Sequence, residues 1–248
     1  MTRSSNPSLT VLVDVELPDP EPLPDALVEL LSPLQVVLVG WYAIPEQTAP
    51  EQAREQFGEE AQAALDAAAR PFVERGAAIE TVLVFTPDEF ASIEQISIDA
   101  GCDAILLPGR MEQLDQILLP VRGLHNAEKI APVCAALVRN GTTTVTLLHV
   151  VEEGESAERA RTEVLEPMTR TLVQAGIDAG MIFREALSAS SPVDAIIDHA
   201  SHTDAVIIGE TDPSMREILF GTVPEQIVER ADVPVVLVRN PNRGNGEA

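Results

Sequence analysis

The chain has 248 residues, of which 45% are apolar and only 3% aromatic, and 40 acidic against 16 basic residues give a formal net charge of −24. This length allows one large domain or two of ordinary size, and the composition predicts cores built from aliphatic side chains. The negative charge disfavours DNA, RNA and anionic membrane surfaces as partners, because these are negatively charged themselves.

The acidic composition is also poor in lysine, since Lys129 is the single lysine of the chain. A net charge of this size strains a compact fold by self-repulsion. In about 1 M salt the Debye length falls to about 3 Å, and the repulsion is largely screened. We therefore expect a halophilic protein adapted to a salt-rich cytoplasm, with an ordinary acidic bacterial protein as the alternative.

No segment of the sequence has the pattern of a secretion signal or a membrane anchor. Residues 1–8 are polar, and the longest apolar stretch, near 35–44, is far shorter than the roughly 20 residues that span a bilayer. We expect a cytoplasmic protein without membrane insertion. Cys102 and Cys134 are too few for a disulfide framework or a metal knuckle, and we expect two buried thiols.

In the first half, short apolar runs alternate with amphipathic segments. Strands are expected at 9–15, 35–40, 79–85 and 103–107, and helices at 25–31, 51–75 and 87–100. Thr86 is the expected N-cap of the third helix, and Gly101 follows its last residue.

The pattern then restarts. Strands are expected at 116–121, 144–151, 181–186, 204–209 and 233–238, helices at 126–139, 155–174 and 217–231, and a further helix that begins at Ser191. Ser191 and Pro192 open their helix in the favoured order of cap and proline. Pro132 and Pro167 fall inside expected helices, where we expect kinks or displaced helix starts.

Continuously apolar strands separated by helices predict parallel sheets covered on both faces. Residues 93–108 and 193–210 share a helix, a polar linker, an Asp-Ala pair, an apolar strand and a tight turn. The fold class is therefore α/β, with two related units and a repeat of about one hundred residues. The first unit is truncated, because the last helix and strand of the second have no counterpart in it.

The segment 209–239 contains Gly209, Gly221 and Thr222 between two apolar strands. It resembles the C-terminal third of the universal stress protein family, whose pattern is Gly, two residues, Gly, nine residues, Gly, then Ser or Thr. Residues 116–123 and 147–152 resemble the family's first and second strands. The resemblance implies Rossmann-like units of the adenine nucleotide alpha hydrolase type.

The resemblance also implies a domain organisation. Residues 1–113 are interpreted as a degenerate, truncated copy of a universal stress protein domain, residues 114–240 as a complete one, and 241–248 as a disordered tail. Because family members assemble through the last strand, residues 233–238 are the expected contact of a homodimer.

Glycines at the carboxyl end of a parallel strand let backbone N–H groups approach a phosphate, and a hydroxyl at the next helix start adds a donor. If an adenine nucleotide such as ATP or AMP binds, its phosphate cradle would consist of Gly209, Thr211, Gly221, Thr222 and the Val223 N–H. Pro120, Val121 and Val150 would flank the base and the ribose.

This segment departs from the family pattern at several positions. Asp212 replaces the second glycine, the spacing to Gly221 is one residue short, and Pro213 removes an N–H from the cradle. Arg122 stands where nucleotide-binding members carry an acidic residue. Arg122 therefore pairs either with a phosphate or with Asp212, and the second arrangement would close the pocket.

Two functional hypotheses stay open. One is a nucleotide-sensing stress protein, and the other is an interaction module without a nucleotide that regulates a partner protein, for example a membrane transporter. No Walker A lysine or Gly-x-Ser-x-Gly elbow is present, so we expect no catalysis. His199 and His202 beside Asp198 fit a solvated helix end, and no metal is expected.

Overall fold

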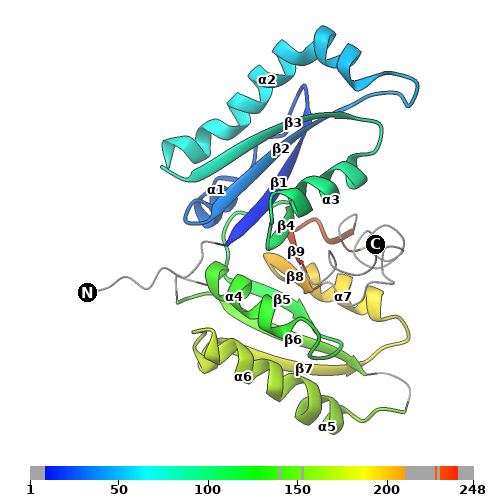
Figure 1. Ribbon diagram of the computed structural model, residues 1–248. Coiled ribbons are helices and arrows are strands. Elements are labelled where there is room, and N and C mark those ends of the chain that lie inside the picture. Colours follow the sequence, from blue (N-terminus) through cyan, green and yellow to red (C-terminus); the bar gives the residue numbers. More distant parts are fainter. Residues whose placement is uncertain (1–8, 139–140, 152–153, 210–226, 228–229, 240–248) are drawn as a thin grey trace. The chain divides into compact units, whose positions relative to one another are not determined.

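The computed structural model describes residues 9–138, 141–151, 154–209, 227 and 230–239 (Figure 1). The chain divides into two compact units, residues 1–106 and 107–248. In each unit, parallel strands alternate with helices, which confirms the α/β class expected from the apolar runs. The tail and most of the helix expected at 217–231 lie outside the described residues.

The first unit has four parallel strands in the order β3-β2-β1-β4. They are β1 (Thr10–Leu17), β2 (Gln35–Ala43), β3 (Ala78–Thr86) and β4 (Ala104–Leu107). The helices are α1 (Asp25–Leu31), α2 (Pro50–Glu74) and α3 (Glu89–Asp99). Helices α2 and α3 pack on the sheet, so the Val and Leu runs of the inner strands are buried on both faces.

The second unit has five parallel strands in the order β9-β8-β5-β6-β7. They are β5 (Gln116–Pro120), β6 (Thr144–Val151), β7 (Ile182–Ser188), β8 (Ala205–Gly209) and β9 (Val235–Val238). The helices are α4 (Ala127–Leu137), α5 (Ala157–Ala160), α6 (Glu166–Gln174) and α7 (Pro192–Ala200). Taken in chain order, the first four strands of each unit follow the same arrangement.

In each unit, an aspartate accepts hydrogen bonds from backbone N–H groups at the start of the first strand. Asp103, just before β4, accepts a hydrogen bond from the Thr10 N–H at the start of β1, at 2.9 Å. Asp204, just before β8, accepts bonds from the N–H groups of Asp115 and Gln116 at the start of β5, at 2.8 and 2.9 Å. The repeated Asp-Ala pair of the sequence therefore ties the first strand of each unit to its neighbour.

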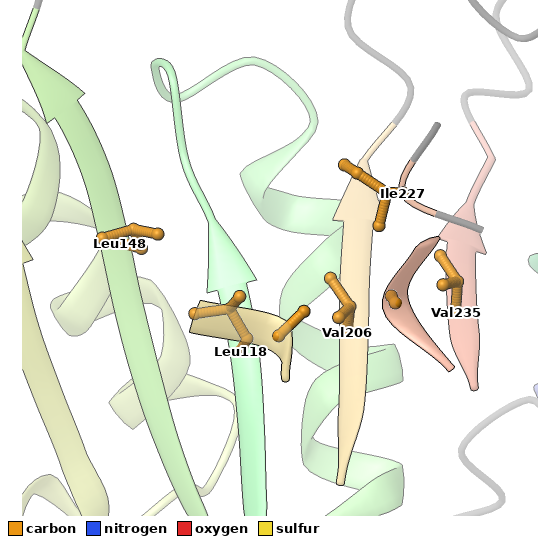
Figure 2. Close-up of a cluster of buried hydrophobic side chains, with 7 residues drawn as sticks. Leu118, Leu148, Val206, Ile227 and Val235 are labelled. Atoms are coloured by element: carbon orange, nitrogen blue, oxygen red, sulfur yellow. The ribbon is translucent and has the colours of Figure 1, made fainter. Parts of the chain in front are cut away.

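A cluster of aliphatic side chains forms part of the second unit's core (Figure 2). Leu118 of β5, Leu148 of β6, Val206 of β8 and Val235 of β9 lie along the sheet, and each is at most 1% exposed. Ile227, from the segment between β8 and β9, packs against them and is equally buried. The core is aliphatic, as the low aromatic content predicts.

The N-cap of α3 differs from the sequence prediction. Asp88, not Thr86, is the capping residue, and its Oδ1 accepts a hydrogen bond from the Ala91 N–H at 3.0 Å. Thr86 is the last residue of β3, and its Oγ1 accepts from the Asp88 N–H at 3.0 Å. The expectation was wrong because both residues suit a cap, and the strand extends far enough to include Thr86.

Pro167 interrupts the helix expected at 155–174. The segment runs as α5, a π-helical stretch (Arg161–Leu165) and α6, and the N–H of Glu166 bonds to the Arg161 carbonyl. A proline lacks the N–H that would continue the α-helical ladder, and a wider turn just before it absorbs the disruption. By contrast, α4 stays continuous around Pro132.

The cap of α7 supports a stability prediction. Ser191 Oγ accepts a hydrogen bond from the Asp194 N–H at 3.3 Å, so Ser191→Ala leaves this N–H without its partner. We expect a loss of about 1 kcal/mol in the free energy of unfolding, measured by urea denaturation and circular dichroism. Ser190→Ala, at the exposed neighbouring residue, is the control. An equal loss in both variants would contradict the cap.

Candidate functional site

The strand order of the second unit places a topological switch point at β5. From β5 the chain adds β6 and β7 on one side, and then β8 and β9 on the other. In open parallel sheets, ligands bind outside the carboxyl ends of the strands where the order reverses. The carboxyl ends of β5 and β8 are therefore the candidate binding edge, and they carry Pro120 and Gly209.

The chain leaves β5 through Pro120 and Val121. The Val121 N–H donates to the Leu148 carbonyl of β6 at 2.8 Å, so the ladder between β5 and β6 continues one residue past the strand. Val121 is buried, Arg122 is exposed, and Val150 near the end of β6 is half-buried. The structure thus places Pro120, Val121 and Val150 at the carboxyl ends of two adjacent strands.

The buried His149 of β6 links Val121 to Glu155 through its two ring nitrogens. Its Nδ1 lies 2.8 Å from the Val121 carbonyl oxygen, and its Nε2 lies 3.0 Å from Glu155 Oε2. The imidazole is only 3% exposed. Both ring nitrogens of this buried histidine therefore have partners. Glu155 was missed, because nothing in a helical pattern shows that a carboxylate six residues ahead turns back to the strand.

Gly209 ends β8 where helix α4 begins close to the strand. A Cβ at this position would lie 2.5 Å from Ile130 Cδ1, so a larger residue would force the Ile130 side chain to move. Asn126, which precedes α4 with a left-handed φ of 65°, donates from Nδ2 to the Val238 carbonyl at 3.4 Å. The start of α4 is thereby held against the ends of β8 and β9.

The remaining predicted cradle residues lie outside the described residues. They are Thr211, Gly221, Thr222 and Val223, and Asp212 and Pro213 belong to the same segment. The relation between Asp212 and Arg122 therefore stays a prediction. Of the predicted set, Pro120, Val121, Arg122, Val150 and Gly209 are described.

A separate groove of about 560 Å³ lies beside α7 in the second unit and was not expected from the sequence. Arg230 Nη1 lies 3.0 Å from Asp194 Oδ1 at this groove. Hydrogen bonding with Ser191 and the Arg230 guanidinium lower the pKa of the Asp194 carboxyl. His199, which also lines the groove, contacts the Ala195 carbonyl and Glu185. The groove is thus bordered by side chains that already have partners.

The described residues also bear on metals, thiols and membranes. Among the described His, Cys, Asp and Glu side chains, no group of three or more is arranged to hold a metal ion. Cys102 and Cys134 are buried, and burial raises the pKa of the Cys134 thiol to about 12. In the described part of the chain, no helix combines the length and the apolarity needed to cross a bilayer.

Comparison with known proteins identifies the family. Residues 113–239, just over half of the chain, match the model of the universal stress protein family. The chain belongs to the universal stress protein family. No curated protein matches it in sequence.

Solved structures extend the likeness of this universal stress protein to about 95% of the chain. A universal stress protein from Archaeoglobus fulgidus DSM 4304 has a TM-score of 0.65 at 16% identity, covering 95% of this chain and 97% of that one. A putative universal stress protein from Pseudomonas aeruginosa UCBPP-PA14 has a TM-score of 0.53 at 16% identity, covering 96% and 95%. At such identities the likeness shows the fold alone.

Proposed function

We propose that this universal stress protein is a non-catalytic sensor that binds an adenine nucleotide, ATP or AMP, at the carboxyl edge of its second unit. The observation that carries the proposal is the switch point at β5, where the carboxyl ends of the paired strands β5 and β8 lie side by side. An edge of this kind is where doubly wound sheets bind their ligands.

The side chains at the carboxyl edge of the second unit suit both the base with its ribose and the phosphate of a nucleotide. Val150 is half-buried and offers apolar surface for a base and ribose, which is the usual lining of a small-molecule site, whereas Val121 is buried. Arg122, just beyond Val121, is exposed and carries the charge that suits a phosphate. We propose that the cradle is completed by Thr211, Gly221, Thr222 and Val223.

The proposal predicts heat from a calorimetric titration of the full chain. ATP and AMP should each be titrated with Mg²⁺ in molar KCl, where the net charge of −24 is screened. Saturable heat from at least one nucleotide is expected. If neither nucleotide gives heat while circular dichroism shows a folded protein, the sensor hypothesis is wrong. That result would favour an interaction module without a nucleotide.

Val150→Asp tests the position of the ligand. A carboxylate at this half-buried position removes apolar contact and repels the anionic nucleotide, so we expect at least a tenfold weaker Kd, or about 1.4 kcal/mol. Thr144→Asp is the matched control, because Thr144 lies on the same face of β6 at the opposite end of the strand. Equal affinity in the two variants would place the ligand elsewhere.

The homodimer through residues 233–238 stays a prediction. Within the second unit, β9 pairs with β8 in parallel, from Val206 with Val235 to Gly209 with Val238. A solution mass measured at micromolar concentration in molar KCl decides the question, since a dimer doubles the 26.6 kDa of one chain.

A further inference from the structure

His149 lies near the carboxyl end of β6, with an oxygen atom at each of its ring nitrogens. Its side chain is buried, with 3% of it exposed. Nδ1 lies 2.8 Å from the Val121 carbonyl oxygen, and Nε2 lies 3.0 Å from Glu155 Oε2. A carbonyl oxygen has no hydrogen to donate, and neither has an ionised carboxylate. Both contacts therefore need a hydrogen on the side of the histidine.

A neutral histidine does not satisfy both contacts. It carries one N–H and one lone pair, and the N–H is used by the Val121 carbonyl. The lone pair on Nε2 would then face the lone pairs of the Glu155 carboxylate at 3.0 Å, which is repulsive. One additional proton between Nε2 and Oε2 turns this repulsion into a charge-assisted hydrogen bond. A buried cation alone would be costly, and the carboxylate compensates its charge.

The charged side chains of the helical segment after β6 are exposed and pair with one another. Helix α5 and the π-helical stretch that follows it pack against β6. Their ion pairs join Arg159 with Glu163 and Arg161 with Glu158. The hydrogen bond with Glu163, and to a smaller extent the charge of Glu155, raises the pKa of Arg159. A cation near Glu155 favours its charged form, so the additional proton belongs on Nε2 of the histidine.

The neighbouring strands and helix α7 leave the histidine with one charged contact. Strand β7 places the neutral Ala186 in register with the histidine, and its charged Arg184 lies nearer the middle of the strand and is exposed. Arg122, beyond β5, is also exposed. Helix α7 lies on the opposite face of the sheet, because Leu148 packs with Ala200 and adjacent strand residues point to opposite faces. Among the described charged groups, the carboxylate is therefore the one that contacts the ring.

We propose that His149 is a buried imidazolium between the Val121 carbonyl and the Glu155 carboxylate, and that its second proton makes nucleotide binding at this edge dependent on pH. The part about binding rests on the proposed function, because Glu155 follows the carboxyl end of β6, at the edge to which the nucleotide is assigned.

The direction of the pH dependence follows from the charge of the pair. The second proton comes from solvent, and the protonated pair has no net charge. When the proton leaves Nε2, the Nδ1–H stays on the Val121 carbonyl, whereas Glu155 loses its donor and its negative charge is left unbalanced. An anionic nucleotide should therefore bind more tightly to the protonated pair, and its Kd should rise as the pH rises.

Nitrogen NMR of the full chain tests the imidazolium without any nucleotide. The protein is labelled with ¹⁵N, kept in molar KCl at pH 7, and the ring signals of its four histidines are assigned. We expect both ring nitrogens of His149 to carry protons. A ring with one N–H and one unprotonated nitrogen would overturn the proposal.

Glu155→Gln separates the proton from the contact. A glutamine amide donates a hydrogen bond to an unprotonated Nε2, so the contact persists without the additional proton. We expect a folded variant, checked by circular dichroism, in which Nε2 is unprotonated at pH 7. Glu163→Gln, which removes the exposed partner of Arg159, is the matched control and should keep the wild-type signals. A doubly protonated ring in Glu155→Gln would contradict the role of the carboxylate. If this variant does not fold, the wild-type spectrum decides.

Calorimetry at pH 6 and pH 9 tests the link to the nucleotide. From pH 6 to pH 9 the Kd of ATP should rise about fivefold more in the wild type than in Glu155→Gln, which is the lower end of usual couplings between two sites. The variant corrects for the titration of the nucleotide's own phosphate. Equal pH dependence in the two proteins would disprove the link. No heat at either pH would refute the proposed function and the link with it, and the NMR spectrum would still decide on the imidazolium.

Discussion

Replacing Gly109 by alanine should cost the second unit about 2–3 kcal/mol of unfolding free energy, as overpacking of a rigid site does. A Cβ at Gly109 would lie 2.4 Å from the backbone carbon of Val233 and 2.6 Å from the Pro234 nitrogen. Backbone atoms cannot rotate away as a side chain can. The Arg110 N–H also bonds to the Asp232 carbonyl at 2.9 Å, which fixes this contact beside the start of β9.

The measurement for Gly109→Ala is urea unfolding followed by far-ultraviolet circular dichroism in molar KCl. Fluorescence would not report it, because the only tryptophan, Trp41, belongs to the first unit. Gly123→Ala is the matched control, since a Cβ there meets only the edge of the His125 ring, at 3.4 Å. Equal midpoints for the two variants would show that residues 109 and 233 are not in close contact.

Asp14→Asn should stabilise the first unit by up to about 3 kcal/mol at pH 8, because burial of this β1 side chain raises its pKa from 3.8 to about 6. The folded pKa lies above the unfolded one, so the folded state binds the proton more tightly. The penalty of the charged form is absent below about pH 4, grows up to about pH 6, and is complete above it. Asparagine has no charge to bury.

The test compares urea unfolding of wild type and Asp14→Asn at several pH values, followed by Trp41 fluorescence. The difference between the two proteins should be near zero at pH 4 and largest at pH 8. Asp66→Asn should show no such growth, because Asp66 is exposed. A variant that is less stable than wild type at pH 8 would mean that Asp14 has a partner that stabilises its charge.

The strands could be predicted from the sequence because their signal is local. Each buried strand is a run of Val, Ile, Leu and Ala between polar turns, and its burial on both faces needs no alternation. The helix ends were harder to predict. Asp88 and Thr86 are both favoured cap residues, and the length of β3 decides between them. At Pro167 the sequence indicates a disruption, but not that a π-helical turn absorbs it.

The sites were less accessible to sequence reasoning, because they depend on residues far apart in the chain. Pro120, Val121 and Gly209 could be placed at strand ends from their pattern alone. The buried Asp14 was missed, although an aspartate inside a run of valines and leucines is a visible signal. Its meaning requires the register that puts Asp14 beside Trp41, and that register is not a local property.

The carboxyl edges of the two units offer different chemistry. Asp14, Glu16 and Glu89 make the edge of the first unit acidic and unsuited to a phosphate. At the edge of the second unit, Val150 provides half-buried apolar surface and Arg122 an exposed positive charge. We therefore propose that the nucleotide binds to the second unit alone.

Hydrogen–deuterium exchange of the full chain with and without saturating ATP tests this assignment most directly. We expect slower exchange at the carboxyl ends of β5 and β8, in peptides that cover residues 117–123 and 205–209, and unchanged exchange in β1 to β3. Unchanged exchange at both strand ends while ATP binds, or protection confined to the first unit, would contradict the account.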